Sequence, residues 1–164
     1  SFCISSPIWT PPLAASPRPD SPTLWLASLP PQPPQAELGA LQLAWLGDAV
    51  WDLHQRLRHC RLPGRAGDLH RSVVAVVKAQ AQAEALQRLD PWLAPEEREQ
   101  VRRGRNRAGA GPRGGDRALY GQATGFETML GWLFLRNPGR LAELLDHLEE
   151  TASPTAAPAH ESPP

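Results

Sequence analysis

The segment LAWLGDAVWDL, residues 43–53, decides how this chain folds. It lies inside a proline-free stretch from Glu37 to Arg58 in which leucine, alanine and tryptophan recur every three or four residues. That period is typical of a helix, and apolar side chains cover so much of its circumference that we expect it to be central rather than peripheral. Asp48 interrupts this apolar surface, and Asp52 follows one turn later on the same face.

Helical patterns continue along the chain. Asp68 predicts the N-cap of a helix that ends before Pro91. A short helix begins near Pro95, and apolar periodicity resumes over residues 123–136 and again, after an Asn-Pro-Gly turn, over residues 140–150. The expected buried side of the helix that follows Asp68 is Val73, Val74, Val77, Ala81, Ala85 and Leu89. Since no segment alternates as a strand does, we predict an all-α domain of about five helices.

The two ends of the chain differ in composition from this middle part. Of the 19 prolines, ten lie in residues 1–35 and four in residues 154–164. Proline removes backbone donors and fixes φ, so we interpret residues 1–35 as a disordered extension without packed elements, and a targeting segment is the less favoured alternative. Residues 151–164 are interpreted as a second disordered tail, which leaves residues 36–150 as the domain.

Composition excludes several classes of protein. No apolar run approaches the ~20 residues that cross a bilayer. Cys3 and Cys60 provide neither a disulfide framework nor a zinc site, so we expect a reducing environment, and the five histidines have no metal-binding spacing. The net charge is zero, with 17 basic and 17 acidic residues, but seven of the arginines lie between Arg98 and Arg117.

The arginine-rich segment RRGRNR, residues 102–107, is a candidate phosphate-binding element. It belongs to a glycine-rich stretch, residues 101–121, that we predict to be an exposed loop. Arginine forks match phosphate oxygens and glycine allows close approach of the backbone, although such a run is as often only a solvated surface. Lys78 is the sole lysine, and its simplest interpretation is a long side chain that reaches past the core to solvent.

Two acids in apolar helices are the candidate metal ligands. A buried carboxylate is costly unless it is paired, so Asp48 could instead meet an arginine of another helix, and Glu127 could cap a helix N-terminus. Taken together, with no lysine expected to pair them, Asp48 and Glu127 indicate a hard cation such as Mg²⁺. Asp52 is a weaker candidate ligand.

The motif LAWLGDAVW resembles the LGDA helix of the ribonuclease III catalytic domain, and TGFETMLGWLFL, residues 124–135, resembles that family's second motif. Between them, DLHR, VKAQAQAEAL, PEE and RRGRN narrow the resemblance to the short Mini-ribonuclease III branch, which has the nuclease domain alone. The resemblance covers about residues 38–148. It implies a dimeric helical bundle of the ribonuclease III type.

The resemblance also implies a function and a site. It implies a homodimeric, Mg²⁺-dependent endoribonuclease that cuts double-stranded RNA and matures the ends of the 23S ribosomal RNA precursor, with a large-subunit ribosomal protein as a candidate partner. Asp48 matches the catalytic, metal-binding aspartate and Glu127 the metal-binding glutamate. The implied RNA contacts are Arg102, Arg103, Arg105, Asn106 and Arg107, with Lys78 a weaker candidate. We expect a cytoplasmic protein, with the plastid stroma as the alternative, and a dimer seam on the first helix with Trp45 and Trp51.

Two departures from full-length ribonuclease III support the narrower branch. Ala44 stands where that enzyme has a glutamate, and Thr124 stands where it has an aspartate or asparagine. Two other functions remain open at this point. One is a catalytically inactive ribonuclease III fold that binds RNA in ribosome assembly, although such proteins lose the acids; the other is a helical protein-interaction module.

Overall fold

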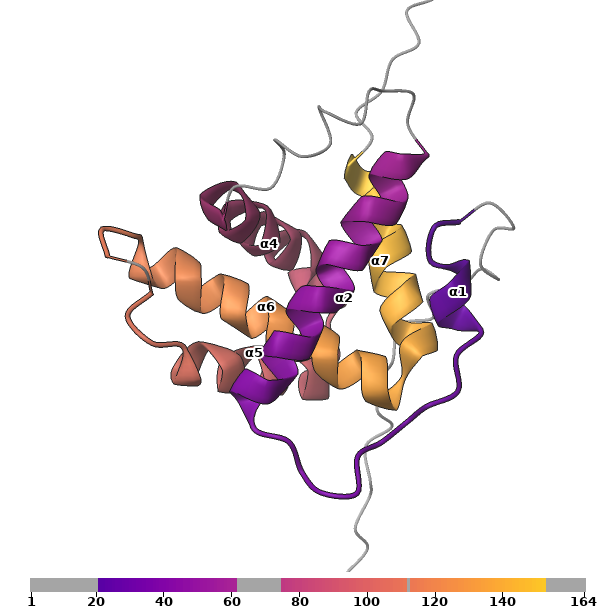
Figure 1. Cartoon of the computed structure of the whole chain (residues 1–164), viewed down its shortest axis with the longest axis horizontal. Coiled ribbons are helices and arrows are strands. Elements are labelled where there is room, and N and C mark those ends of the chain that lie inside the picture. The colour runs from indigo at the N-terminus through magenta and orange to yellow at the C-terminus, as the bar shows by residue number, and fades with distance from the viewer. Residues whose placement is uncertain (1–20, 62–74, 112, 153–164) are drawn as a thin grey trace, which may run out of the picture.

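The structure, a computed structural model, describes residues 21–61, 75–111 and 113–152. These residues contain no strand, and five helices of thirteen or more residues form most of them, which confirms the all-α prediction (Figure 1). In chain order the elements are α1 (Leu24–Ala27), α2 (Ala40–Cys60), α4 (Ala75–Leu89), the 3₁₀ turn η1 (Asp90–Trp92), α5 (Pro95–Arg107), α6 (Arg117–Arg136) and α7 (Pro138–Ala152). Among these described helices, none is both long and apolar enough to cross a membrane.

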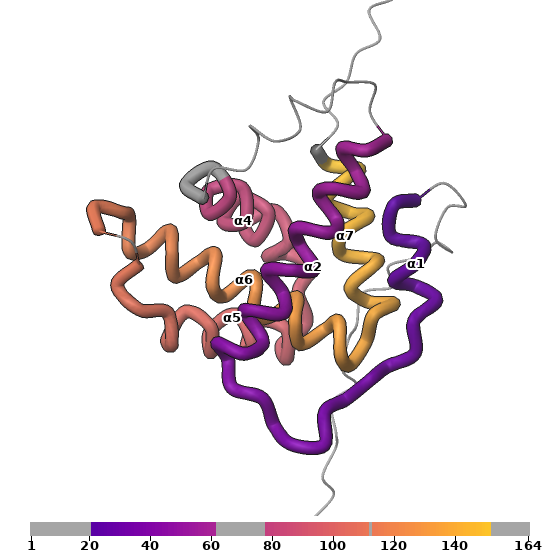
Figure 2. The backbone as a smooth tube through the Cα atoms, in the orientation of Figure 1, coloured from indigo at the N-terminus to yellow at the C-terminus, as the bar shows by residue number. Residues whose placement is uncertain are grey.

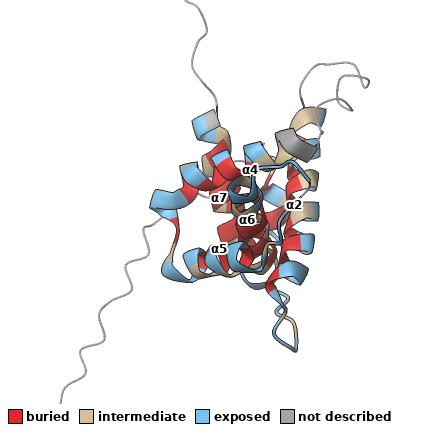
Figure 3. Cartoon of the chain, turned by 90° about the vertical axis from the view of Figure 1, so that its left-hand side faces the viewer, coloured by how far each residue is buried: buried red, intermediate tan, exposed pale blue. Residues whose placement is uncertain are grey.

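Helix α6 is the centre of the bundle. It packs against α2, α4, α5 and α7, and buried residues gather around it (Figure 3). Its apolar residues Phe126, Met129, Leu130 and Leu133 are almost wholly removed from solvent. Burial on this scale supplies most of the free energy that stabilises the fold, at about 1.5–3 kcal/mol for each large side chain.

Two glycines allow α2 and α6 to cross at backbone contact. A Cβ atom on Gly47 would lie 1.8 Å from the carbonyl oxygen of Glu127, and one on Gly131 would lie 2.0 Å from the carbonyl oxygen of Leu43. No side chain fits at either position unless the helices separate. The crossing therefore depends on the absence of a side chain at both glycines.

Helix α5 extends further than the sequence suggested. Residues 101–107 are helical, so the prediction of a loop there is wrong, and α6 begins at Arg117 with Asp116 as its N-cap rather than at residue 123. The reason is a second close crossing, at which a Cβ on Gly104 would lie 2.8 Å from the Cα of Gly125. Gly104 thus packs against α6 and does not serve the approach to a phosphate.

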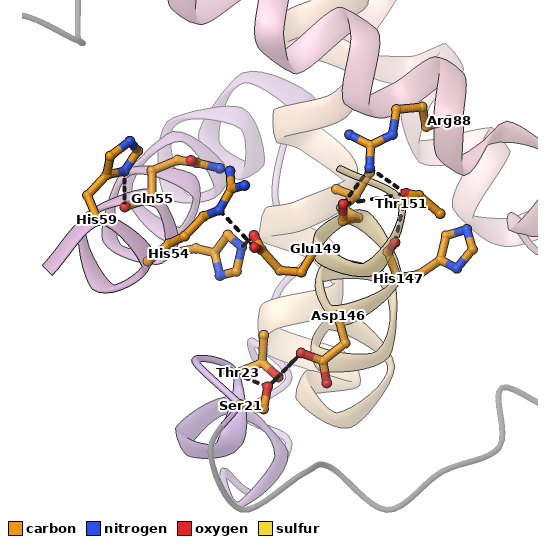
Figure 4. A network of polar contacts seen from close by, with 12 residues as sticks. Ser21, Thr23, His54, Gln55, His59, Arg88, Asp146, His147, Glu149 and Thr151 are labelled. Atoms are coloured by element: carbon orange, nitrogen blue, oxygen red, sulfur yellow. Dashed lines mark hydrogen bonds and ion pairs between the residues drawn. The ribbon is translucent and has the colours of Figure 1, made fainter. Parts of the chain in front are cut away.

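The proline-rich N-terminal segment also packs. Leu26 of α1 is fully buried, and the hydroxyl groups of Ser21 and Thr23 donate hydrogen bonds of 2.6 and 2.7 Å to Asp146 of α7 (Figure 4). The backbone then passes the end of α6, where the amide of Gln32 donates to the carbonyl of Leu135 (Figure 2). The prediction that residues 1–35 contain no packed element is therefore wrong from residue 21 onward, and residues 1–20 and 153–164 lie outside the described part.

Helix α2 is central on one side only. Leu43 and Val50 are buried, and Trp51 packs edge-on against Phe126 with ring centroids 5.1 Å apart. The opposite side is exposed, with 82% of the Trp45 surface open to solvent and with Leu41 and Leu53 also exposed. The prediction of a central rather than peripheral helix therefore holds for one side of α2, because no other helix of the described bundle covers the opposite side.

Helix α4 buries a different set of residues from the predicted one. It ends at Leu89 as expected, but Ala81 is exposed, and the buried residues are Gln82, Ala83, Ala85, Leu86 and Leu89. The predicted cap Asp68 and the side chains of Val73, Val74 and Val77 lie outside what the structure describes.

A buried ion pair joins α7 to α5. The guanidinium of Arg140 donates two hydrogen bonds, of 2.8 and 3.2 Å, to the carboxylate of Glu97, and a third to the backbone carbonyl of Trp92. Because both side chains are almost fully buried, removal of either partner leaves an uncompensated charge. The pair therefore fixes how α7 is placed relative to α5.

The glycine crossing yields a direct prediction. Gly47→Ala and Gly131→Ala should each lower the melting temperature, because an overpacked core costs about 1–3 kcal/mol, which exceeds the ~1 kcal/mol that alanine gains over glycine in a helix. Gly121→Ala, on the same helix as Gly131 but with no atom near the added Cβ, is the matched control and should be neutral or stabilising. Equal melting temperatures for all three variants, measured by circular dichroism, would contradict the close crossing.

Candidate active site

The two acids singled out in the sequence meet where α2 crosses α6. Asp48 directly follows Gly47, and Glu127 provides the carbonyl that Gly47 approaches, so the crossing makes the two carboxyl groups neighbours. Glu127 is not a helix cap, since it lies well inside α6. The structure therefore unites two residues that are far apart in the sequence.

Lys78 of α4 binds both aspartates of α2. Its ammonium forms an ion pair with Asp48 and lies 2.8 Å from Oδ1 of Asp52. The expectation that no lysine would pair with these acids is wrong, because the contact joins two helices whose spacing in the sequence gives no sign of it. Burial alone would lower the pKa of Lys78, but its hydrogen bonds to both carboxylates raise it above its ordinary value, so the ammonium stays charged.

Gln82, one turn after Lys78, holds Glu127. Its side-chain amide donates a 2.9 Å hydrogen bond to Oε1 of Glu127, and only 2% of the residue is exposed. Gln82 was not among the residues expected to form the site. The signal that could have found it is its phase, since Gln82 lies in register with the buried Ala85, Leu86 and Leu89 on α4.

Burial and a like charge both act on Glu127. Burial, the largest cause, and the neighbouring Asp48 carboxylate raise the pKa of its carboxyl group to about 7, although the Gln82 amide and the Lys78 ammonium offset part of the rise. Near neutral pH the site therefore carries more negative than positive charge, because the single ammonium of Lys78 faces three acids. A proton or an added cation would relieve this.

The donor atoms fit one Mg²⁺ ion. Two adjacent carboxylates supply the oxygen ligands that Mg²⁺ prefers, and this ion usually retains several waters, so one or two carboxylates are enough to hold it. No group of three or more histidine, cysteine, aspartate or glutamate side chains in the described part of the chain forms a larger metal cluster. Asp48 and Glu127 are the two carboxylates that could hold such an ion, and Asp52 pairs with Lys78 beside them.

The two departures noted in the sequence add no further ligand here. Ala44 is buried and its side chain has no oxygen, and the hydroxyl of Thr124 donates a 3.0 Å hydrogen bond to the backbone carbonyl of Tyr120 within α6. The acidic set therefore stays limited to the residues on α2 and to Glu127.

The arginine-rich segment forms the C-terminal half of α5. Arg102 pairs with Glu99 on the same helix. Arg103 donates to the side chain of Gln100 and to the backbone carbonyl of Leu38, which holds it against the start of α2.

The remaining polar residues of the segment face solvent. Arg105, Asn106 and Arg107 are exposed. Arg103, Asn106 and Arg107 line a cavity of about 520 Å³ together with the first turn of α2, where helix amides point outward. This cavity adjoins the N-terminal end of the helix that carries Asp48.

The charge on Glu127 predicts a pH-dependent stability. In metal-free protein its pKa of about 7 exceeds the ~4.3 of an unfolded chain, so the fold is most stable when the group is protonated and loses stability as the pH rises toward 7. Glu127→Gln should raise the free energy of unfolding at pH 8 in EDTA, by on the order of 1–3 kcal/mol, and by less at pH 5. The exposed Glu96→Gln is the control, and a Glu127→Gln variant that melts below the wild type at pH 8 would contradict the assignment.

Comparisons with known proteins identify relatives of this chain. The ribonuclease III domain family matches residues 41–138, which include Asp48, Gln82 and Glu127. The chain is 46% identical to a Mini-ribonuclease 3 of Synechocystis, over 85% of this chain and 96% of that protein. It is 49% identical to a Mini-ribonuclease 3 of Synechococcus, over 70% and 83%.

A third relative has a comparable identity. A Mini-ribonuclease 3 of Symbiobacterium thermophilum is 44% identical over 66% of this chain and 85% of that protein. No solved structure matches the chain significantly. The family match over more than half of the chain, together with relatives at this identity, shows that the chain belongs to the ribonuclease III family, in its Mini-ribonuclease 3 branch.

Proposed function

We propose that this chain cleaves double-stranded RNA with Mg²⁺ as cofactor and leaves 5′-phosphate and 3′-hydroxyl ends. Membership of the ribonuclease III family makes the chain an endoribonuclease. The observation that carries the finer proposal is the meeting of Asp48 and Glu127 at the α2–α6 crossing, where two acids with one lysine leave a place for a cation.

Asp48 and Glu127 would hold the metal. When bound, Mg²⁺ supplies a Lewis acid that polarises the phosphodiester and activates water. Residues of the chain position these ligands: Lys78 orients Asp48 and Asp52 from α4, and Glu127 is itself half-buried at the helix crossing. We assign Lys78 to this orienting role first, because both of its contacts are with acids of the site.

The arginines of α5 would bind the RNA backbone. Arg105 and Arg107 are exposed, and Arg107 shares its cavity with the amides at the start of α2, which favour an anion such as a phosphate. Arg103 and Asn106 line the same cavity, and Arg102 is exposed on the same helix. Contacts of this kind recognise the shape and backbone of an A-form duplex rather than its bases.

A homodimer would complete the enzyme. The exposed stripe on α2, formed by Leu41, Trp45, Ala49 and Leu53, is an apolar surface that a second copy could bury. A two-fold axis would then relate two active sites to the two strands of one duplex. Trp45 belongs to this seam, whereas Trp51, which the sequence also suggested, is buried in the core of its own chain.

The natural substrate we propose is the base-paired end of the 23S ribosomal RNA precursor, in the cytoplasm. A net charge of zero gives little non-specific attraction to RNA, so a large-subunit ribosomal protein on the substrate would help to recruit the enzyme.

The central test is cleavage of a labelled ribosomal-precursor duplex with Mg²⁺ and with EDTA. Asp48→Asn should reduce cleavage by roughly a hundredfold or more, since loss of a metal ligand removes several kcal/mol of transition-state stabilisation, while the fold is retained. Asp90→Asn, an exposed aspartate that pairs with Arg98, is the matched control and should leave the rate unchanged. Full activity of Asp48→Asn would remove Asp48 from the site, and wild-type protein that binds RNA without cutting it would favour a structural role in ribosome assembly.

RNA binding by α5 can be tested through the salt dependence of the binding constant. Replacing Arg105 and Arg107 with alanine should weaken duplex binding and reduce the slope of log K against log salt by about one for each phosphate that the variant no longer neutralises. Arg98→Ala, at the other end of the same helix, serves as control and should keep the wild-type slope. If the double variant also keeps that slope, these arginines do not contact phosphates.

The dimer can be tested without RNA. Trp45→Glu places a charge in the centre of the apolar stripe and should convert a dimer of twice 17.9 kDa into a monomer, as measured by sedimentation. Trp92→Glu changes another exposed tryptophan, away from the stripe, and should leave the mass unchanged. A wild-type protein that is already a monomer would contradict the proposed seam.

A further inference from the structure

Gln82 is a polar side chain in an otherwise apolar environment. Only 2% of its surface is exposed, and its neighbours on the same face of α4 are the buried Ala85, Leu86 and Leu89. A buried amide costs free energy unless it is hydrogen-bonded, and an apolar residue would fill this position at lower cost. The position therefore contains a polar group that packing alone does not require.

The partner of Gln82 is one of the two site acids. Its side-chain amide donates a 2.9 Å hydrogen bond to Oε1 of Glu127, which belongs to a different helix. Lys78, four residues earlier and hence on the same side of α4, contacts Asp48. Helix α4 thus directs two donors to the two acids, a charged one to α2 and a neutral one to α6.

The hydrogen bond restricts the last torsion of Glu127. The carboxylate torsion of a glutamate is broad when nothing fixes it. A donor on one oxygen sets the orientation of the carboxylate plane, and an amide N–H does this without adding a charge. A second lysine at this position would instead neutralise Glu127 and compete with a metal for it.

We propose that Gln82 is a positioning residue, which holds the Glu127 carboxylate in the orientation that binds a divalent cation together with Asp48. This inference rests on the proposed Mg²⁺ function and deepens it. Gln82 acts through Glu127, and its contribution is to metal affinity rather than to the reaction itself. Hydrogen-bonding partners of metal ligands typically contribute about 10–100-fold to affinity.

The test uses Gln82→Met, which keeps the length and unbranched shape of the side chain and removes the donor. The probe is MgCl₂ added to the full chain without RNA, and the readout is the concentration of Mg²⁺ that gives half of the rise in melting temperature. We expect this concentration to increase about 10–100-fold, while the melting temperature in EDTA is equal to or above that of the wild type. Saturating Mg²⁺ should restore the cleavage rate of the variant. If Gln82 had only a structural role, excess Mg²⁺ would not restore the rate.

Gln100→Leu is the matched control, because Gln100 is a buried glutamine of α5 with 8% exposure and does not contact the two acids. It should bind Mg²⁺ as the wild type does. If Gln82→Met fails to fold, Gln82→Leu replaces it in the same titration, since leucine suits the apolar face of α4.

The outcomes separate this inference from the proposed function. If the wild-type protein binds Mg²⁺ and cleaves RNA, and a folded Gln82 variant binds Mg²⁺ with unchanged affinity, then only the positioning role of Gln82 is overturned. Wild-type protein that neither gains stability from Mg²⁺ nor cleaves RNA overturns both.

Discussion

The close crossing of α2 and α6 at Gly47 and Gly131 is the constraint on which the rest of this structure depends. Carbonyl oxygens of each helix occupy the space that a side chain on the other would need. This contact fixes the distance between the helices, and Asp48 is next to Gly47 while Glu127 supplies the facing carbonyl. The same geometry that packs the core therefore brings two carboxylates together. Packing and the active site cannot be changed independently at this point.

Two neighbouring acids in a partly buried place destabilise the metal-free fold, and the surrounding residues reduce this cost only in part. Burial raises the pKa of Glu127 to about 7, and one ammonium, that of Lys78, faces Asp48 and Asp52. A site that stays short of positive charge is suited to bind a cation, so the loss of stability and the binding capacity have one cause. The neutral donor Gln82 fits this interpretation, because it orients an acid without neutralising it.

Different surfaces of the bundle suit the proposed dimer contact and the proposed RNA contact. The outer side of α2 presents an apolar stripe around Trp45, which suits a second copy of the chain. The C-terminal half of α5 presents arginines beside the first turn of α2, which suits a phosphate backbone. Helix α2 is thus shared by the core, the acid pair, the proposed dimer seam and the border of the proposed RNA surface. These four roles of one helix explain why residues 43–53 contain both the apolar pattern that predicts the fold and the first acid of the site.

Local sequence determined the helical class, the approximate helices and the two acids, because the 3.6-residue period and an acid in an apolar run are properties of neighbouring residues. It also carried the family resemblance. Only the tertiary structure decided that α5 continues through the arginines, since Gly104 packs on Gly125 where local composition suggested a loop. It likewise decided that residues from Ser21 onward pack on α7, that Lys78 pairs with Asp48, and that Gln82 holds Glu127. Each of these contacts joins residues distant in the chain, and their free energy comes from desolvation and complementary charge across helices, which no local pattern records.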